Sequence, residues 1–420
     1  MEDKELNIIK AVHLQEEGFS RRVFMQLASA AGISLAMTPS VSKIAEAAGT
    51  VKAKLASQTP TLANQYYNTW NRGAISVTKG LGIDLVNLNH EFDITRLLSQ
   101  VRGLPASQAN MLISQIYPSG ALPNVAKICQ SSSVQFVALW DTIEWFTPPD
   151  VGDYYVSFQA PYSVEEAYEV AKLLFESIGG EGKVAHILGV ASANDTNRTL
   201  GVELALKEYP GIQLVGKLRT DWDREEGRKV MLSMLGAHPD MKGVFCQNDN
   251  IALGVLAAMR ERNITNIKVV GIDGVPDGLK EVAKGGPMIG THSTLIPFQS
   301  GFAAVTAFDA LNGWKPTLGE RMLHTGALLT TAENAADVDK KLYAPDAEPY
   351  DWKLMSRTLN PDKWDPQNKI WALDPEVFWK NTPEGREKLN KIYDGAKERG
   401  EFSKVDALYA EHYKSGPFKA

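Results

Sequence analysis

Cysteine is scarce in this chain, and the two residues present, Cys129 and Cys246, carry no metal or redox motif. Neither lies in a Cys-x-x-Cys pair or beside a histidine at the spacing of metal ligands, which argues against a zinc site or a dithiol centre. Cys246 ends an apolar run that is typical of a buried strand, so we expect a structural thiol there. The lobe assignment below separates the two cysteines, and we therefore expect no disulfide between them.

Several other features are also missing. No stretch reaches the roughly 20 apolar residues that a membrane-spanning helix needs. The formal net charge of −6 disfavours nucleic acid or an anionic membrane surface as the main partner. The sequence contains neither HExxH nor GxSxG, and it has no clustered metal ligands. We therefore expect no catalytic residues, no metal and no cofactor.

The first 47 residues have the layout of an export signal. A pair of arginines, Arg21 and Arg22, precedes a mildly apolar stretch over 27–37, and small residues at 45–47 form a cleavage pattern. The arginine pair resembles the twin-arginine type of signal. The alternative is an amphipathic surface helix that happens to hold two arginines. We predict a twin-arginine export signal over residues 1–47, no membrane anchor, and a soluble mature chain in the periplasm.

From residue 51 onward, short apolar runs alternate with longer amphipathic patterns, as in a parallel sheet covered by helices. The predicted strands are 84–88, 111–115, 136–139, 183–188, 213–218, 243–246 and 267–272. The predicted helices, where apolar residues recur every three or four positions, are 164–178, 199–209, 225–235, 251–261 and 298–311. Ligands of such α/β sheets bind at the carboxyl ends of the strands, so residues just after each strand are candidates for a site.

Beyond residue 334 the composition changes. The tail is rich in tryptophan, with four residues between positions 352 and 379, and a charged helical pattern runs over 384–413. So high an aromatic content is not typical of a disordered linker. We predict an appended helical extension over 334–420 that packs on the body of the protein.

Polar and aromatic side chains follow several of the predicted strands. They include Arg198, Trp222, Asn248, Asp249 and Asp273. Carboxylates, amides and an arginine suit vicinal hydroxyl groups, and an indole suits the apolar face of a sugar ring. For Asp249 the favoured interpretation is a cap of the helix that follows, and for Asp273 a cap is the alternative.

Two of these segments together resemble motifs of the type I periplasmic binding proteins, the family of ribose-binding protein that serves sugar importers. They are Gln-Asn-Asp at 247–249 and Val-Gly-Ile-Asp-Gly-Val-Pro-Asp at 270–277. The similarity covers residues 51–337 and not the tail. It implies an α/β fold of two Rossmann-like lobes with parallel sheets, joined by a three-strand hinge. The implied first lobe is 51–157 with 293–330, and the implied second lobe is 158–292.

The resemblance also implies which residues bind the ligand. The matched positions are Asn64, Tyr66, Tyr67, Asp141, Arg198, Trp222, Asn248 and Asp273. Secondary candidates near the same strand ends and the second crossing are Gln115, Trp140, Trp145 and Gln299. After Asp141 the sequence has Thr142 where the family has an arginine, which leaves the ligand open among pentoses, hexoses and sugar alcohols.

The expected function is capture of a sugar or sugar alcohol by hinge closure, followed by delivery to the membrane subunits of an ABC importer. The twin-arginine export machinery is a further expected partner, nucleic acid is not, and we expect a monomer. An exported Rossmann-type oxidoreductase is disfavoured because residues 58–64 lack the Gly-x-Gly-x-x-Gly fingerprint. A DNA-binding regulator of the same fold would need an N-terminal helix-turn-helix. A ligand sensor for a chemoreceptor or sensor kinase stays open as an alternative.

Overall fold

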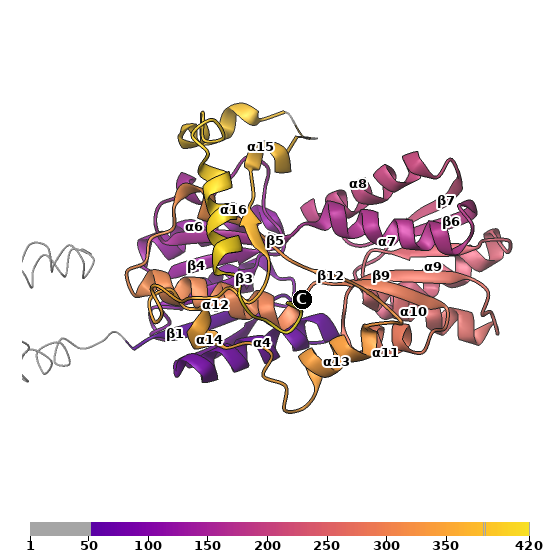
Figure 1. Cartoon of the computed structure of the whole chain (residues 1–420), viewed down its shortest axis with the longest axis horizontal. Helices are drawn as coiled ribbons and strands as arrows, with labels where there is room; N and C mark the ends of the chain where they lie inside the picture. The colour runs from indigo at the N-terminus through magenta and orange to yellow at the C-terminus, as the bar shows by residue number, and fades with distance from the viewer. Residues whose placement is uncertain (1–51, 381, 383, 420) are drawn as a thin grey trace, which may run out of the picture.

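The computed structural model describes residues 52–380, 382 and 384–419, which form two α/β lobes lying side by side (Figure 1). The export signal predicted over residues 1–47 lies outside the described residues. Each lobe is built on one sheet, and all strands but two run parallel to their neighbours. The predicted fold class, two Rossmann-like lobes with parallel sheets, is confirmed.

The first lobe contains a seven-stranded sheet. Its spatial order is β13 (Ile370–Ala372), β11 (Met322–Thr325), β5 (Tyr155–Pro161), β4 (Gln135–Leu139), β3 (Met111–Gln115), β1 (Lys54–Thr59) and β2 (Asp84–Asn89). The helices of this lobe are α4 (Gln65–Leu81), α5 (Ile94–Arg102), α6 (Leu122–Ser131), α12 (Ile296–Leu311), α14 (Trp352–Met355), α15 (Pro375–Phe378) and α16 (Glu401–His412).

The second lobe contains a six-stranded sheet. Its spatial order is β12 (Leu328–Thr331), β10 (Met288–Ser293), β9 (Lys268–Asp273), β8 (Gly243–Cys246), β6 (Glu181–Leu188) and β7 (Gly211–Arg219). Its helices are α7 (Ser163–Ser177), α8 (Ala193–Glu208), α9 (Arg224–Ala237), α10 (Asp249–Glu261), α11 (Pro276–Ala283) and α13 (Ala335–Tyr343). Short 3₁₀ turns elsewhere in the chain span Ser119–Ala121, Pro148–Asp150, Leu318–Glu320, Arg386–Lys388 and Lys391–Tyr393.

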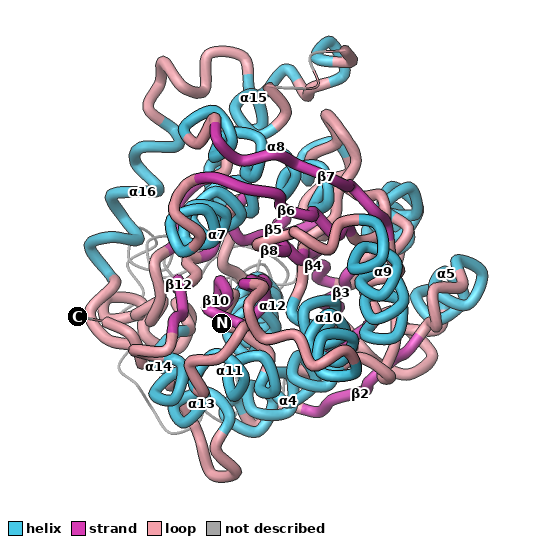
Figure 2. The backbone as a smooth tube through the Cα atoms, turned by 90° about the vertical axis from the view of Figure 1, so that its right-hand side faces the viewer, coloured by secondary structure: helices cyan, strands magenta, loops and turns pink. Residues whose placement is uncertain are grey.

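Successive strand residues face opposite helical layers, as expected for parallel strands buried on both faces. In β4, Val137 and Leu139 belong to the hydrophobic cluster that includes α4 and α12. Their neighbours Phe136 and Ala138 belong to the cluster that includes α5 and α6. In the second lobe α7 and α8 cover one face of the sheet, and α9 and α10 cover the other (Figures 1 and 2).

Within the part of the chain that the structure describes, four passages run between the lobes. Three passages follow β5, follow β10 and join β11 to β12. The fourth passage follows α13, which packs on α11 of the second lobe, and leads to α14, which packs on α4 and α12 of the first. The tail therefore contacts both lobes.

The structure differs from the predicted boundaries in several places. Residues 158–161 were assigned to the second lobe, but β5 continues to Pro161 in the first sheet, where it pairs with β11. Residues 293 and 328–330 were assigned to the first lobe, but they belong to β10 and β12, which pair antiparallel in the second sheet. The tail is not only helical, because β13 pairs antiparallel with β11 at the edge of the first sheet. Of the helix predicted over 384–413, only α16 and two 3₁₀ turns form. Gly395 and Gly400 both adopt φ values of 67°, which interrupt helical backbone, and Gly400 is the residue from which α16 begins.

Aromatic side chains attach the tail to the first lobe. The indole of Trp352 lies so close to Gly80 and Gly301 that a Cβ at these positions would approach it to 2.7 and 2.2 Å. Arg357 of the tail lies over the ring of Trp314, just after α12, with 4.9 Å to the centroid, and over Trp364 of the tail itself, with 3.9 Å. Among the described helices, none is both long and apolar enough to cross a membrane.

Candidate functional site

A cavity lies between the two lobes, at the carboxyl ends of strands from both sheets. It holds about 520 Å³ of space, part of it open to solvent. The first lobe lines it with Asn64, Tyr66, Tyr67, Phe92, Gln115, Tyr117, Trp140 and Asp141. The second lobe lines it with Asn194, Arg198, Trp222, Asn248 and Asp273. Six aromatic rings, two carboxylates and one guanidinium thus face a shared space.

The eight principal candidates from the sequence all line this cavity, and so do the secondary candidates Gln115 and Trp140. Gln299 does not line the cavity itself. It lies behind two lining residues, since its Oε1 accepts hydrogen bonds from Tyr66 and Trp140. The structure therefore brings eleven of the twelve candidates together. That these side chains bind a ligand stays a prediction.

Trp145 lies outside the cavity, which corrects its place among the candidates. Its indole packs against Trp379 with 5.4 Å between ring centroids. Its Nε1 donates to the backbone carbonyls of Thr382 and Glu384 at 3.0 and 2.9 Å. Sequence proximity to Asp141 suggested a place in the site, but this ring anchors the tail instead.

Three lining residues were missed by the list of candidates. Phe92 and Tyr117 lie in the loops that follow β2 and β3, and Asn194 begins α8 after β6. All three obey the rule that residues after strand ends face the ligand. The rule would have found them had it been applied to every loop of the first lobe and to the whole loop before Arg198.

Two asparagines, one from each lobe, are oriented by helix caps. Asn64 Oδ1 accepts from Tyr66 N at the start of α4, and Asn248 Oδ1 accepts from Ile251 N at the start of α10, both at 2.8 Å. Their amide nitrogens both point to the carbonyl oxygen of Trp222, at 3.5 and 3.3 Å respectively. Capping thus fixes the oxygens and leaves the NH₂ groups at the cavity.

The interpretations of Asp249 and Asp273 as helix caps are wrong. Asn248 caps α10, whereas the buried Asp249 accepts from Val275 N at 2.9 Å and from Thr291 Oγ1 at 2.7 Å. Helix α11 begins after Val275 without a side-chain cap, so Asp273 does not cap it. Asp273 is left to face the cavity.

Three lining residues have backbone conformations that L-residues rarely adopt. The φ values are 68° at Trp140, 61° at Trp222 and 123° at Asp273. Such strain persists only where the surrounding structure holds it, and it gathers at functional sites. Gly189 makes room for one of these side chains, because a Cβ there would lie 2.2 Å from the Trp222 ring.

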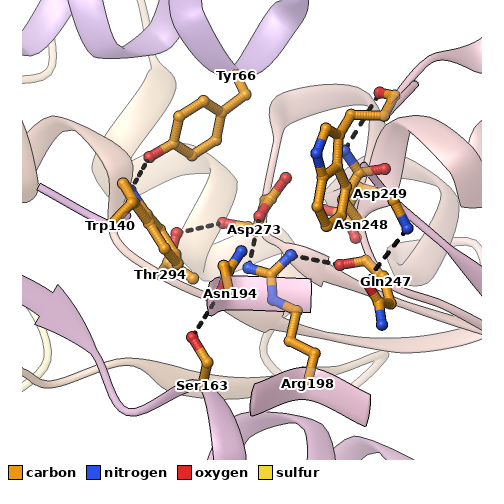
Figure 3. A network of polar contacts seen from close by, with 12 residues as sticks. Tyr66, Trp140, Ser163, Asn194, Arg198, Gln247, Asn248, Asp249, Asp273 and Thr294 are labelled. Atoms are coloured by element: carbon orange, nitrogen blue, oxygen red, sulfur yellow. Dashed lines mark hydrogen bonds and ion pairs between the residues drawn. The ribbon is translucent and has the colours of Figure 1, made fainter. Parts of the chain in front are cut away.

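Arg198 forms the polar centre of the site (Figure 3). Its buried guanidinium donates to Asp273 Oδ1 at 3.3 Å and to the carbonyl of Gln247. The same guanidinium lies over the rings of Trp140 and Trp222, with 5.4 and 5.8 Å to the centroids. A buried charge is thereby paired and held in one orientation.

A hydrogen-bonded wall closes the side of the cavity formed by the first lobe. The hydroxyl of Tyr66 donates to Gln299 Oε1 at 2.9 Å and accepts from Trp140 Nε1 and from Gln115 Nε2. Gln299 Nε2 in turn donates to the carbonyl of Thr294 at 2.7 Å. These bonds connect the wall to the start of α12 and so to the hinge after β10.

The acids of the cavity are held in a low-dielectric environment. Burial raises the pKa of Asp273 to about 7, although Arg198 opposes the shift. Burial also raises the pKa of Asp141 to about 6, opposed by the backbone of Asn194. Carboxylates that have lost water gain most from new hydrogen-bond donors, which a hydroxyl-rich ligand supplies.

The lobes touch along the rim of the cavity. Asn250 Nδ2 donates to Asn64 Oδ1 at 2.9 Å, and the amide of Asp277 donates to Gln65 Oε1 at 3.2 Å. Each bond joins the second lobe to the first. Within residues 52–419, where described, no group of three or more His, Cys, Asp or Glu is placed to hold a metal.

Comparison with known proteins matches residues 58–313 to the periplasmic binding protein domain. The chain is 30% identical over 250 residues to the ribose import binding protein of Salmonella typhimurium, covering 59% of this chain and 81% of that one. It is 28% identical over 240 residues to the xylitol-binding protein of Mycolicibacterium smegmatis, covering 56% of this chain and 66% of that one. The chain thus spans just under two thirds of the xylitol-binding protein.

Among solved structures, the chain is similar to a twin-arginine translocation pathway signal protein from Burkholderia phytofirmans. The TM-score is 0.66 at 26% identity, covering 71% of this chain and 95% of that one.

Proposed function

The chain belongs to the periplasmic binding protein domain family, and from this premise we propose that it captures a sugar or sugar alcohol between its two lobes. The observation that carries the proposal is the shared cavity. Amides, carboxylates and an arginine there can replace water around hydroxyl groups, and aromatic rings can cover the apolar face of the same ligand. The relatives named above are binding proteins, so family membership favours binding over catalysis.

The proposed mechanism is hinge closure. Each lobe offers half of the binding groups, with Tyr66, Tyr67 and Asp141 from the first and Trp222 and Asp273 from the second. The ligand favours the closed form only through contacts that are better there than in the open form. Closure would also form the rim contacts between the lobes, and an importer would recognise this closed outline.

We further propose that the protein works as a periplasmic monomer. It would leave the cytoplasm by the twin-arginine route and deliver its ligand to the membrane subunits of an ABC importer. The predicted signal over residues 1–47 and the names of the relatives support this assignment. Export assayed with Arg21 and Arg22 both changed to lysine tests the route, and retention of the precursor in the cytoplasm is the expected result.

A thermal-shift screen tests the binding function. The probes are D-ribose, D-allose, xylitol and myo-inositol, which the names of relatives and similar structures print. A ligand present at one hundred times its dissociation constant stabilises the native state by about 2.7 kcal/mol, which shifts the melting temperature by several degrees. At least one probe should produce such a shift. No shift with any of these probes or with a wider panel of sugars and polyols would contradict the proposal.

Asp273→Ala tests the assignment of the site. Loss of a charged acceptor should weaken binding by about tenfold or more, as judged by calorimetry. The melting temperature should also fall, because Arg198 loses its buried partner. Asp374→Ala is the matched control, since Asp374 caps α15 outside the cavity and its loss should leave affinity unchanged. Equal affinity of wild type and Asp273→Ala would refute the site.

A further inference from the structure

The tail reaches the ligand cavity from behind through Tyr343. This residue is the last of α13 and is buried between the lobes. Its hydroxyl donates to the carbonyl oxygen of Gly274 at 3.0 Å. Gly274 directly follows Asp273, so the tail contacts the loop that presents a proposed ligand-binding carboxylate. Position 343 lies outside the matched domain at 58–313.

The hydrogen bond falls on a peptide unit that is held at both ends. The Gly274 carbonyl accepts from Tyr343, and the amide of Val275, in the same peptide unit, donates to Asp249 Oδ2 at 2.9 Å. One residue earlier, the carbonyl of Asp273 accepts from the amide and hydroxyl of Thr294 at 3.0 and 3.2 Å. Three partners thus fix the backbone over 273–275.

This loop needs such support. Asp273 has a φ value of 123°, a conformation that an L-residue rarely adopts, and Gly274 follows it at 70°, where glycine alone fits easily. Gly274 is also packed tightly, since a Cβ there would lie 2.2 Å from Ser293 Oγ. A strained backbone without its hydrogen bonds relaxes, and the carboxylate of Asp273 would turn with it.

The backbone of Tyr343 is itself tied to the first lobe. Its carbonyl oxygen accepts from the guanidinium of Arg72 in α4, at 3.5 and 3.4 Å to the two terminal nitrogens. Tyr343 therefore connects α4 of the first lobe to the Asp273 loop of the second.

We propose that Tyr343 is a positioning residue of the binding site: the tail, through the hydroxyl of Tyr343, holds the Gly274–Val275 peptide and thereby the carboxylate of Asp273 in the orientation that binds ligand. This inference rests on the proposed sugar-binding function and adds to it a role for the tail. Tyr343 is not among the residues that line the cavity, so its proposed role is to position Asp273 rather than to bind.

Tyr343→Phe tests the proposal, because it removes the hydroxyl and keeps the ring. Calorimetry with D-ribose, D-allose, xylitol and myo-inositol should show dissociation constants about three- to tenfold higher than those of wild type, the effect of one buried hydrogen bond. Tyr350→Phe is the matched control. Tyr350 is another buried tyrosine of the tail, and its hydroxyl has no hydrogen-bond partner among the described residues. Its loss should leave the dissociation constants unchanged.

A second measurement needs no ligand. Hydrogen–deuterium exchange should speed up at the amides of residues 274 and 275 in Tyr343→Phe and stay as in wild type in Tyr350→Phe. If Tyr343→Phe lowers only the melting temperature, with affinity and local exchange unchanged, the residue is structural and the proposal is overturned. If wild type binds no probe, the proposed function fails. Faster exchange in Tyr343→Phe would then still support the contact between Tyr343 and the loop. Unchanged exchange would refute it.

Discussion

Gly189→Ala tests whether the Trp222 ring is a binding surface. Gly189 follows β6, and the six-membered ring of Trp222 lies across it. The added methyl carbon would lie 2.2 Å from Cε2, Cζ2 and Cη2 of that ring. Carbon atoms normally approach to about 3.5–4.0 Å, so the indole must retreat by about 1.5 Å. Gly189 cannot yield easily, because its amide donates to Gln247 Oε1 and its carbonyl accepts from Arg219.

The size of the effect follows from what the ring would lose. An aromatic surface contributes about 0.5–1.5 kcal/mol beyond simple burial. Displacing it from a sugar also re-exposes apolar area worth about 25 cal/mol per Å², which adds roughly 0.5–1 kcal/mol for 20–40 Å². Together these terms, about 1–2.5 kcal/mol, predict that Gly189→Ala raises the dissociation constant about five- to seventyfold.

Isothermal titration calorimetry with the best-binding sugar of the screen measures this change. Gly236→Ala is the matched control, because Gly236 is exposed in α9 and a Cβ there meets no atom within 4 Å. That variant should bind as wild type does and melt at the same or a slightly higher temperature. Wild-type affinity in Gly189→Ala, with a crystal structure showing a displaced ring, would refute the idea that Trp222 contributes to binding.

Two further predictions concern acid–base behaviour and the corrected candidate. Burial raises the pKa of Asp249 to about 8 and that of Asp273 to about 7, so the folded protein binds protons that the unfolded chain has released at these pH values. Acidification from pH 8.5 to 6.5 should therefore increase the free energy of unfolding by on the order of 2 kcal/mol, visible as a rising melting temperature that Asp249→Asn largely removes. Below pH 6.5 the free energy of unfolding should stop rising. Burial lowers the pKa of His186 to about 3 and that of His324 to about 4, so these histidines take up protons there only in the unfolded chain. A flat or falling melting temperature between pH 8.5 and 6.5 would contradict this account. Trp145→Phe should lower the melting temperature by loosening the tail while leaving sugar affinity unchanged, and weaker binding by calorimetry would return Trp145 to the site.

The sequence predicted most of the fold because the two lobes consist of regular elements. Apolar runs of four to eight residues located β2, β3, β4, β6, β7, β8 and β9 to within two or three residues. Part of the candidate site followed from one topological rule, since residues after parallel strands converge on the same edge of a sheet. That rule pointed to Arg198, Trp222 and Asp273, whereas first-lobe residues such as Asn64 were assigned through the resemblance to the family.

The remaining features depend on tertiary contacts that leave no local pattern. An aromatic residue in a loop can face the cavity, as Trp140 does, or the tail, as Trp145 does, and both have a positive φ that the sequence does not announce. Gln299 was predicted near the ligand, but its hydrogen bond with Tyr66 places it behind the residues that line the cavity. The path of the tail was equally hidden, because β13 has only three residues and pairs with a strand that is distant in the sequence.

The first sheet draws its strands from both ends of the described chain, and this has a consequence for biosynthesis. Strands β1 to β5 are translated early, but β11, which covers the outer edge of β5, and β13, which pairs with β11, emerge only after most of the second lobe has been made. Until then the nascent chain exposes the edge of β5, a strand whose residues are all buried in the finished protein. Unpaired edges of this kind can pair wrongly with other nascent chains. A ribosome that terminates before residue 322 would thus release a chain with most of the second lobe made and a first sheet that lacks β11. Premature stop codons just before β11 should therefore produce aggregation rather than a smaller working protein.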